Sequence, residues 1–164
     1  MKPLVLASTS RYRRALLERL GLPFTAVAPD CDEDRVKALG LDAETLTLRL
    51  AREKAESIAP HHPGCLILGS DQVADLDGEI LGKPGTAERA CAQLGRMQGR
   101  AHRLVTALCL WDADTGEHVT EVDIHHLRLR PLAPDQIARY VAQDQPLDCA
   151  GSYKIEGPGI ALFE

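Results

Sequence analysis

A carboxylate and an ammonium group twelve residues apart are the first candidates for chemistry in this chain. Asp71 closes a short apolar run, Cys65–Leu68, which predicts a buried strand that delivers the carboxylate at its end. Asp77-Gly78 then predicts a tight hairpin turn, because both positions tolerate positive φ. The returning chain leads to Lys83, so an acid and a base are expected close in space. Ligands usually bind at the carboxyl ends of strands in open α/β sheets, which makes this pair a candidate active site.

The same hairpin has a second interpretation and one difficulty of register. A strand that ends in a capping Asp and a surface hairpin would show the same residues without any activity. A two-residue turn pairs Leu76 with Glu79, which puts Lys83 opposite Gln72 and leaves Asp71 on the other face of the strand. Either a bulge or a strand end at Asp71 would remove the conflict, and both remain open.

A hydroxyl-rich turn, Ser8-Thr9-Ser10, joins a predicted strand at 4–7 to a predicted helix at about 11–20. Ser10 suits the N-cap and Gly21 the left-handed end of this helix. Free amides, hydroxyl groups and the nearby Arg13 and Arg14 are typical of an anion site, although no Walker loop is present. Simple N-capping beside a solvated arginine face explains the turn equally well. The helix residues expected on the buried side are Leu16, Leu17 and Leu20.

A strongly periodic helix is predicted from about 43 to 59, and one of its apolar positions holds a lysine. Leu46, Leu50, Lys54 and Ile58 recur at four-residue spacing. A lysine in such a stripe must either extend its ammonium to water or meet an anion. We favour a Lys54 that points into a cleft, over one that only reaches the surface.

An acidic cluster, Asp32-Glu33-Asp34, lies in a predicted loop. Such clusters are usually only solvated, but their oxygens are also the ligands that divalent cations prefer. The chain from 34 to 40 is expected to be irregular or a short turn of helix. Further predicted elements are strands at 24–28, 102–112, 119–129 and 160–163, and helices at 86–97 and 134–142.

Composition narrows the class of protein. The length of 164 residues suits a single domain, or one domain with two lobes, and the alternating helix and strand patterns favour an α/β fold. A net charge of −5 with dispersed Lys and Arg offers no basic face for nucleic acid. Five widely spaced cysteines without a CxxC motif favour reduced thiols in a cytoplasmic protein. No signal peptide and no apolar run long enough for a bilayer occurs, so no membrane partner is expected.

Six short segments, spread nearly from end to end, form a recognisable set. They are Leu6–Arg14, Asp32-Glu33, Glu53-Lys54-Ala55, Ser70-Asp71-Gln72, Gly82-Lys83-Pro84 and Ala150-Gly151-Ser152-Tyr153. In this order they resemble the motifs of the Maf family of nucleoside-triphosphate pyrophosphatases. Gln72 and the segment 150–157 are most similar to the subgroup that acts on 7-methyl-GTP, whereas the pyrimidine-nucleotide subgroup typically has Thr and Gln at positions 72 and 156. Two departures are Arg11, where the family usually has Pro, and Tyr12, where this subgroup commonly has Trp.

The resemblance implies a fold and a set of roles. The fold is a twisted mixed β-sheet flanked by helices, with two lobes and a cleft between them, as in Maf and ITPase-like proteins. Residues 1–164 would form one domain that lacks the C-terminal segment with which relatives continue. Asp71 would be the catalytic base. The triphosphate would contact Ser8, Arg13, Lys54 and Lys83. Glu33 and Asp71 would bind a divalent cation, Mg²⁺ or Mn²⁺. The choice of base would depend on Tyr12, Gln72 and Glu156.

The activity implied by the resemblance is hydrolysis of 7-methyl-GTP between its α and β phosphates, giving 7-methyl-GMP and pyrophosphate. This reaction would keep modified nucleotides out of nucleic acids, and a homodimer is the family expectation. Three alternatives stay open. They are a pyrophosphatase for ordinary nucleotides such as dTTP, UTP and CTP, a nucleotide-binding regulator of cell division and septum formation, and an α/β domain that binds another phosphorylated metabolite.

Overall fold

The computed structural model describes residues 2–164 as a mixed α/β structure. Six strands are hydrogen-bonded in the order β2-β1-β3-β5-β6, with β4 paired to β3. The strands are β1 (Leu4–Ala7), β2 (Phe24–Val27), β3 (Leu66–Leu76), β4 (Glu79–Leu81), β5 (Ala101–Asp112) and β6 (His118–Arg128). The helices are α1 (Arg11–Glu18), α2 (Glu33–Lys37), α3 (Ala43–Ile58), α4 (Ala87–Met97) and α5 (Pro134–Asp144), with short 3₁₀ turns η1 (Ala59–His61), η2 (Ala150–Ser152) and η3 (Pro158–Leu162). The predicted α/β class with a mixed sheet is confirmed.

The chain divides into two compact units. Unit 1 comprises the chain up to Asp71 together with Thr106–Asp123, and unit 2 comprises Gln72–Val105 together with Ile124–Glu164. No helix formed by residues 2–164 is both long enough and apolar enough to cross a membrane.

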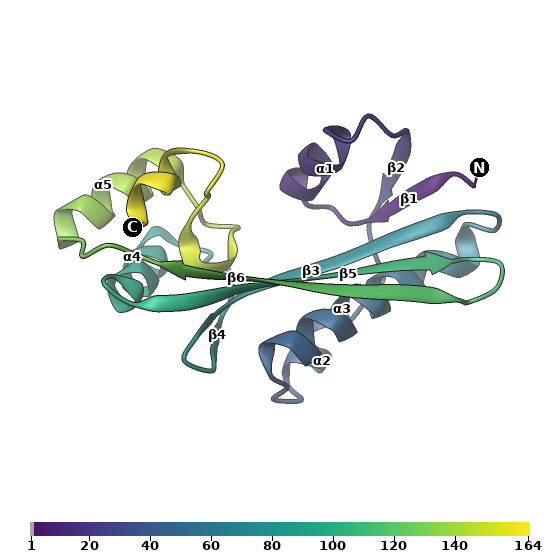
Figure 1. Ribbon diagram of the computed structural model, residues 1–164, viewed down its shortest axis with the longest axis horizontal. Coiled ribbons are helices and arrows are strands. Elements are labelled where there is room, and N and C mark those ends of the chain that lie inside the picture. Colours follow the sequence, from purple (N-terminus) through teal and green to yellow (C-terminus); the bar gives the residue numbers. More distant parts are fainter. Residues whose placement is uncertain (1) are drawn as a thin grey trace. The chain divides into compact units, whose positions relative to one another are not determined.

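Unit 1 is built on parallel strands, with β1 lying between β2 and β3 (Figure 1). Asp42 is the N-cap of helix α3, and its carboxylate accepts hydrogen bonds from the backbone N–H groups of Glu44 and Thr45, each at 3.0 Å. The apolar stripe of α3 is buried as the four-residue spacing predicts. Its core partners on the strands include Val5 and Ile67.

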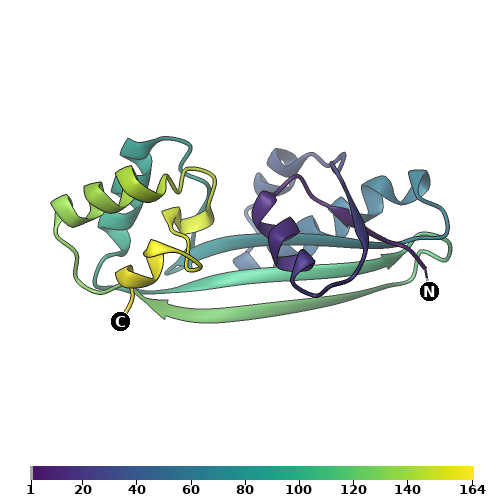
Figure 2. The same ribbon diagram turned by 90° about the horizontal axis from the view of Figure 1, so that it is seen from above.

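Unit 2 is organised by the hairpin between β3 and β4. Asp77 and Gly78 have φ values of 53° and 88°, and Leu76 pairs with Glu79, as the Asp-Gly turn predicts. The buried Asp75 secures this turn by accepting the N–H of Gly78 at 2.7 Å. Helices α4 and α5 pack side by side in both views (Figures 1 and 2), over a core that includes Leu94, Met97, Leu129 and Val141.

The predicted end of the central strand at Asp71 is wrong, because β3 continues through Asp71 to Leu76. The hairpin explains the extra length, since residues 74–76 pair with 79–81 and must therefore be extended. Strand β4 ends at Leu81, so the pairing never reaches Gln72 or Lys83. The expected conflict, in which Lys83 pairs with Gln72 and leaves Asp71 on the other face, therefore does not arise, because Lys83 and Gln72 are not paired.

Three smaller predictions are also corrected. Helix α1 ends at Glu18, so Leu20 lies beyond it, and only Leu17 of the three leucines is buried. The acidic cluster is not in a loop, because Asp32 caps α2 by accepting the N–H of Arg35. The segment 160–163 is no strand but belongs largely to η3, which begins at Pro158, a residue suited to the first position of a helix.

Candidate active site

The closest packing in unit 1 occurs where α3 crosses β3 at Gly69. A Cβ atom on Gly69 would lie 2.0 Å from the carbonyl oxygen of Ala51 and 3.0 Å from the backbone nitrogen of Ala55. The helix backbone can approach the strand this closely only because position 69 has no side chain. Side chains alternate along a strand, so Asp71 follows Gly69 on the same face, and Lys54 follows Ala51 by about one helical turn. The contact therefore positions the Lys54 ammonium next to the Asp71 carboxylate.

Lys54 is the buried centre of a charged cluster. Its side chain is only 5% exposed, and its Nζ lies 2.7 Å from Oδ1 of Asp71 and 2.9 Å from Oε1 of Glu33. Of the two alternatives for a lysine in the apolar stripe, Lys54 meets an anion, and it meets two. That it points into a cleft stays a prediction. These carboxylates come from α2 and β3, the elements on either side of α3 and η1 in the chain, so side chains of three separate elements meet at this nitrogen atom.

Arg13 of α1 adds a second cation, with its Nη2 3.9 Å from Oδ1 of Asp71. Burial lowers the pKa of Arg13, and the charges of Asp71 and Glu33 oppose this effect. The guanidinium nonetheless remains charged, because arginine does not lose its proton in proteins. The distances to both cations are given by the same oxygen of Asp71, Oδ1, which accepts the hydrogen bond from Lys54, whereas Oδ2 accepts no hydrogen bond from another residue in 2–164. One oxygen is thus anchored and the other is left to act on a ligand or a water molecule.

Glu33 is ionised at neutral pH. Its partial burial by itself disfavours the charge, but hydrogen bonds and charge from Lys54, and then from Lys37, lower its pKa to about 2. Lys37 contacts the outer oxygen, with Nζ 3.0 Å from Oε2. Glu33 therefore presents a negative oxygen to each of two lysines, one buried and one about half exposed.

Two converging carboxylates form a partial donor set for a hard divalent cation. Among residues 2–164, no group of three or more His, Cys, Asp or Glu side chains could hold a metal ion alone. Mg²⁺, however, is usually bound through one or two carboxylates, with phosphate oxygens and water completing its shell. Glu33 and Asp71 fit that pattern, since both already face one shared positive group, the Lys54 ammonium.

The hydroxyl-rich turn precedes α1 as predicted. Ser10 is the N-cap, and its Oγ accepts the N–H of Arg13 at 3.4 Å. The buried Ser8 accepts the N–H of Ser10 at 3.1 Å, and its hydroxyl hydrogen has no acceptor elsewhere in the described chain. The first amides of α1 and the Ser8 hydroxyl are thus potential donors to an anion.

Tyr12 carries an arginine on its ring. The guanidinium carbon of Arg11 lies 4.8 Å from the centre of the Tyr12 ring, and its Nη2 donates to the Tyr12 hydroxyl at 2.7 Å. Arg11 is the residue for which the resemblance described above leads one to expect proline. The aromatic face proposed to contact the base is therefore already in contact with a cation in this chain.

The remaining predicted residues belong to unit 2. Gln72, Lys83 and Glu156 are all exposed, and Lys83 forms no hydrogen bond or ion pair with any other described residue. Gln93 of α4 donates to the carbonyl of Gly82 at 3.1 Å and accepts a hydrogen bond from the Ser152 hydroxyl. One amide side chain therefore connects the Gly82-Lys83-Pro84 segment to η2.

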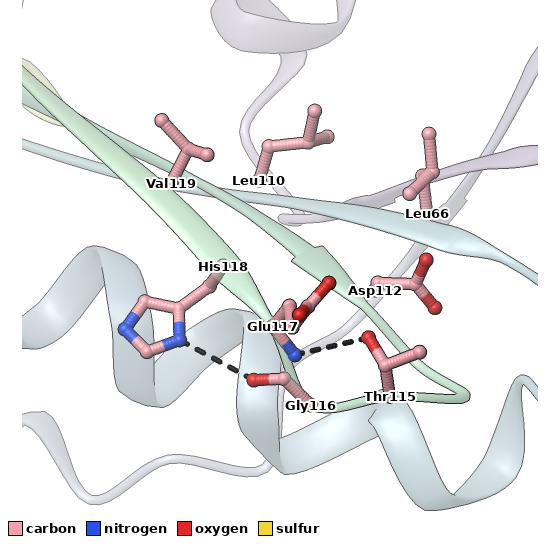
Figure 3. A pocket seen from close by; sticks show the side chains of 8 residues that line it. All are labelled: Leu66, Leu110, Asp112, Thr115, Gly116, Glu117, His118 and Val119. Atoms are coloured by element: carbon pink, nitrogen blue, oxygen red, sulfur yellow. Dashed lines mark hydrogen bonds between the residues drawn. The ribbon is translucent and has the colours of Figure 1, made fainter.

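Two open grooves of unit 1 do not coincide with the charged cluster. One, of about 670 Å³, lies at the β5–β6 turn, where Leu66, Leu110 and Val119 point from three strands toward the same side (Figure 3). A second, of about 580 Å³, is lined by α3 and the start of β6. Neither groove is lined by Asp71 or Lys54, so the volumes of these grooves do not identify the candidate active site.

The sequence analysis missed Gly69, Lys37 and Gln93. A glycine within a strand is a recognised sign of close backbone approach, so Gly69 carried a usable signal. Lys37 also carried a signal, because it follows Glu33 by four residues, the spacing of an ion pair on one helix face. Gln93 carried none, because its role depends on contacts with Gly82 and Ser152, which are distant in the sequence.

The chain is similar to known proteins over nearly its whole length. The model of the Maf-like protein family matches residues 3–164. A 7-methyl-GTP pyrophosphatase of Pseudomonas putida is 51% identical over 164 residues, covering 100% of this chain and 84% of the relative. Proteins with the same name are 49% identical in Xanthomonas campestris, with the same coverage, and 51% identical in Ralstonia nicotianae, covering 99% of this chain and 82% of the relative.

A solved structure, a nucleoside-triphosphatase (dITP/XTP pyrophosphatase) of Mycobacterium abscessus, gives a TM-score of 0.45 at 16% identity over 79% of this chain and 75% of that chain. That similarity is too weak to bear on function. The match over nearly the whole chain and the identity to several relatives are sufficient to assign a family: the chain belongs to the Maf-like proteins.

Proposed function

We propose that this protein is a nucleoside-triphosphate pyrophosphatase that converts 7-methyl-GTP and water into 7-methyl-GMP and pyrophosphate. The observation that carries the proposal is the Asp71 carboxylate, which lies 2.7 Å from the buried Lys54 nitrogen and 3.9 Å from Arg13, while Glu33 contacts the same Lys54 nitrogen. About 50% identity over the whole chain to relatives named 7-methyl-GTP pyrophosphatase supports the choice of substrate. Such an activity would remove a modified nucleotide before it enters nucleic acid.

In the proposed mechanism, Oδ2 of Asp71 accepts a proton from the water that attacks in line with the bond between the α and β phosphates. Negative charge develops on the phosphate oxygens, and Arg13, Lys54 and Lys83 neutralise it. The Ser8 hydroxyl and the first amides of α1 donate hydrogen bonds to the same chain of phosphates. A Mg²⁺ or Mn²⁺ ion held by Glu33 and Asp71 would supply further charge neutralisation.

Recognition of the base is proposed for Tyr12, Gln72 and Glu156. Methylation at N7 leaves guanine with a positive charge, and a cation over an aromatic ring gains about 0.5–2 kcal/mol. Tyr12 offers such a ring. The Glu156 carboxylate would accept hydrogen bonds from the guanine N–H edge while opposing the charge of the ring, and charge-assisted bonds are the stronger kind.

Replacing Glu156 with Gln is expected to shift preference away from the methylated base. The amide keeps one acceptor but loses the negative charge that favours a cationic ring. We expect the ratio of kcat/KM for 7-methyl-GTP over GTP to fall about tenfold, the value of one charge-assisted hydrogen bond. Glu121→Gln, at an exposed position of β6, is the matched control and should leave the ratio unchanged. An unaltered ratio in Glu156→Gln would contradict the role of this carboxylate.

Replacing Arg11 with Pro should act in the opposite direction. The Arg11 guanidinium lies over the Tyr12 ring, where it competes with a cationic base for the same aromatic face. Proline suits the first position of a helix, so α1 should still form. We expect the 7-methyl-GTP over GTP ratio to rise about two- to fivefold, since exposed cation–π contacts are worth about 0.5–1 kcal/mol. Arg14→Ala, which removes an arginine paired with Glu18, provides the comparison and should not move the ratio.

The proposed function is tested by pyrophosphate and monophosphate release from a panel of nucleoside triphosphates, with and without Mg²⁺. The expected result is the highest kcat/KM with 7-methyl-GTP and dependence on the cation. Faster hydrolysis of dTTP, UTP or CTP would replace the proposed substrate with ordinary nucleotides. Nucleotide binding without release of pyrophosphate would favour a regulatory protein instead.

A further inference from the structure

The ammonium of Lys54 lies at the point on which two carboxylates converge. Its nitrogen is 2.7 Å from Oδ1 of Asp71 and 2.9 Å from Oε1 of Glu33, and the Lys54 side chain is 5% exposed. Lysine has three N–H donors, and two of them are accounted for by these contacts. A buried lysine with this geometry is a fixed cation between two anions rather than a side chain that samples solvent.

A lysine and a divalent metal cannot both hold this position. Mg²⁺ binds carboxylate oxygens at about 2.0–2.1 Å, which is shorter than the two contacts of Lys54, and it would replace the ammonium between the same oxygens. Two positive groups sharing two carboxylates would also repel each other, and more strongly beside a buried nitrogen such as that of Lys54 than in bulk water. Either the ammonium or the metal ion can therefore occupy the point between Glu33 and Asp71 at one time.

We propose that Lys54 occupies the metal position in the nucleotide-free protein and keeps the divalent cation from binding there alone. When the nucleotide arrives, its phosphates offer the ammonium a new anionic partner, so Lys54 leaves the carboxylates as the metal ion enters. Binding of the metal and of the triphosphate is thereby coupled, and the protein without substrate has only weak affinity for the cation. This inference rests on the proposed function, because it takes Glu33 and Asp71 as the metal ligands.

The test is a titration of the whole protein with Mn²⁺ in the absence of nucleotide, with free Mn²⁺ measured by electron paramagnetic resonance. Lys54→Met is expected to bind Mn²⁺ about tenfold to a hundredfold more tightly than the wild type, the change that corresponds to losing charge-assisted hydrogen bonds to the competing group. Wild-type affinity should reach a similar level only when a non-hydrolysable triphosphate is present. Equal Mn²⁺ affinity of Lys54→Met and the wild type would overturn the inference.

Lys37→Met is the matched control. This variant also removes a lysine charge beside Glu33. The Lys37 side chain, however, is 49% exposed, and its Nζ lies 3.0 Å from the outer oxygen Oε2 of Glu33 and 3.9 Å from Asp34. Its Mn²⁺ affinity should rise less than about fivefold, because exposed ion pairs are weak. A rise as large as in Lys54→Met would show a general effect of charge and would also overturn the inference.

A measurement on the wild type applies even if Lys54→Met does not fold. The measurement is the rate at which an amine-reactive acetylating reagent modifies Lys54, followed by mass spectrometry. This rate should be low without metal and should increase at Mn²⁺ concentrations that occupy the site. Tight binding of Mn²⁺ with Lys54 still protected would refute the exchange. None of these tests measures catalysis. They can therefore be interpreted even if no substrate of the panel is hydrolysed, and a negative result in them would not contradict the proposed hydrolysis.

Discussion

Replacing Asp71 with Asn is expected to leave a folded protein whose kcat for 7-methyl-GTP falls by about 10²- to 10⁴-fold, the usual contribution of a general base. The amide oxygen of Asn can still accept the hydrogen bond from Lys54, so the packing between α3 and β3 should persist. What disappears is the second carboxylate oxygen, Oδ2, which accepts no hydrogen bond from another residue in 2–164 and which we propose takes the proton. Steady-state release of pyrophosphate measures the loss, and circular dichroism checks the fold.

The matched control for this variant is Asp75→Asn in the same strand. Asp75 is also a buried carboxylate with an arginine partner, Arg103, whose Nε donates to it at 2.9 Å. Its contacts secure the hairpin turn and involve no residue of the charged cluster. Asp75→Asn should therefore lower the melting temperature but retain kcat within a few-fold. If Asp71→Asn kept comparable activity, Asp71 could not be the base.

Replacing Gly69 with Ala is expected to produce the second large effect, through packing rather than chemistry. The new methyl group would lie 2.0 Å from the Ala51 carbonyl oxygen, so α3 must move away from β3. Overpacking of this kind typically costs about 1–3 kcal/mol, and here the neighbouring atoms are backbone and cannot rotate aside. The same shift would separate Lys54 from Asp71, so kcat should fall in the fraction that remains folded. Urea denaturation measures the free energy of unfolding.

Gly95→Ala provides the comparison for a glycine without such a contact. Gly95 lies within α4, has no atom within 4 Å of an added Cβ, and does not have positive φ. Alanine there should stabilise the protein by about 0.4–1 kcal/mol, because it restricts the unfolded chain. A Gly69→Ala protein as stable and active as the wild type would mean that α3 does not depend on this close approach.

Several local features follow from the sequence alone, because they depend on interactions within a few residues. The four-residue spacing around Lys54 predicts both the helix α3 and the lysine on its buried side. The hydroxyl of Ser10 predicts the start of α1, and Asp77-Gly78 predicts the turn and its register. The motif set, read as a whole, is sufficient to indicate the Maf family, which the family match confirms.

The structure corrected predictions from the sequence where a feature depended on segments distant in the chain. The length of β3 past Asp71 is set by its pairing with β4, which the apolar run before Asp71 does not reveal. The exposure of Leu16 and Leu20 depends on where α1 ends and on what lies against it, and neither follows from the spacing of leucines.

The sequence by itself determined that a lysine, Lys54, lies on the buried side of a helix and that an acid, Asp71, lies in a core strand. It also determined that the chain carries the motifs of a nucleotide-hydrolysing family. Only the tertiary structure decided that Glu33 and Asp71 share the Lys54 ammonium, and that Gly69 makes this possible. The physical reason is one of range. Periodicity, capping and turn chemistry act between neighbours in the chain, whereas the meeting of three charged groups depends on how closely a helix backbone packs on a strand.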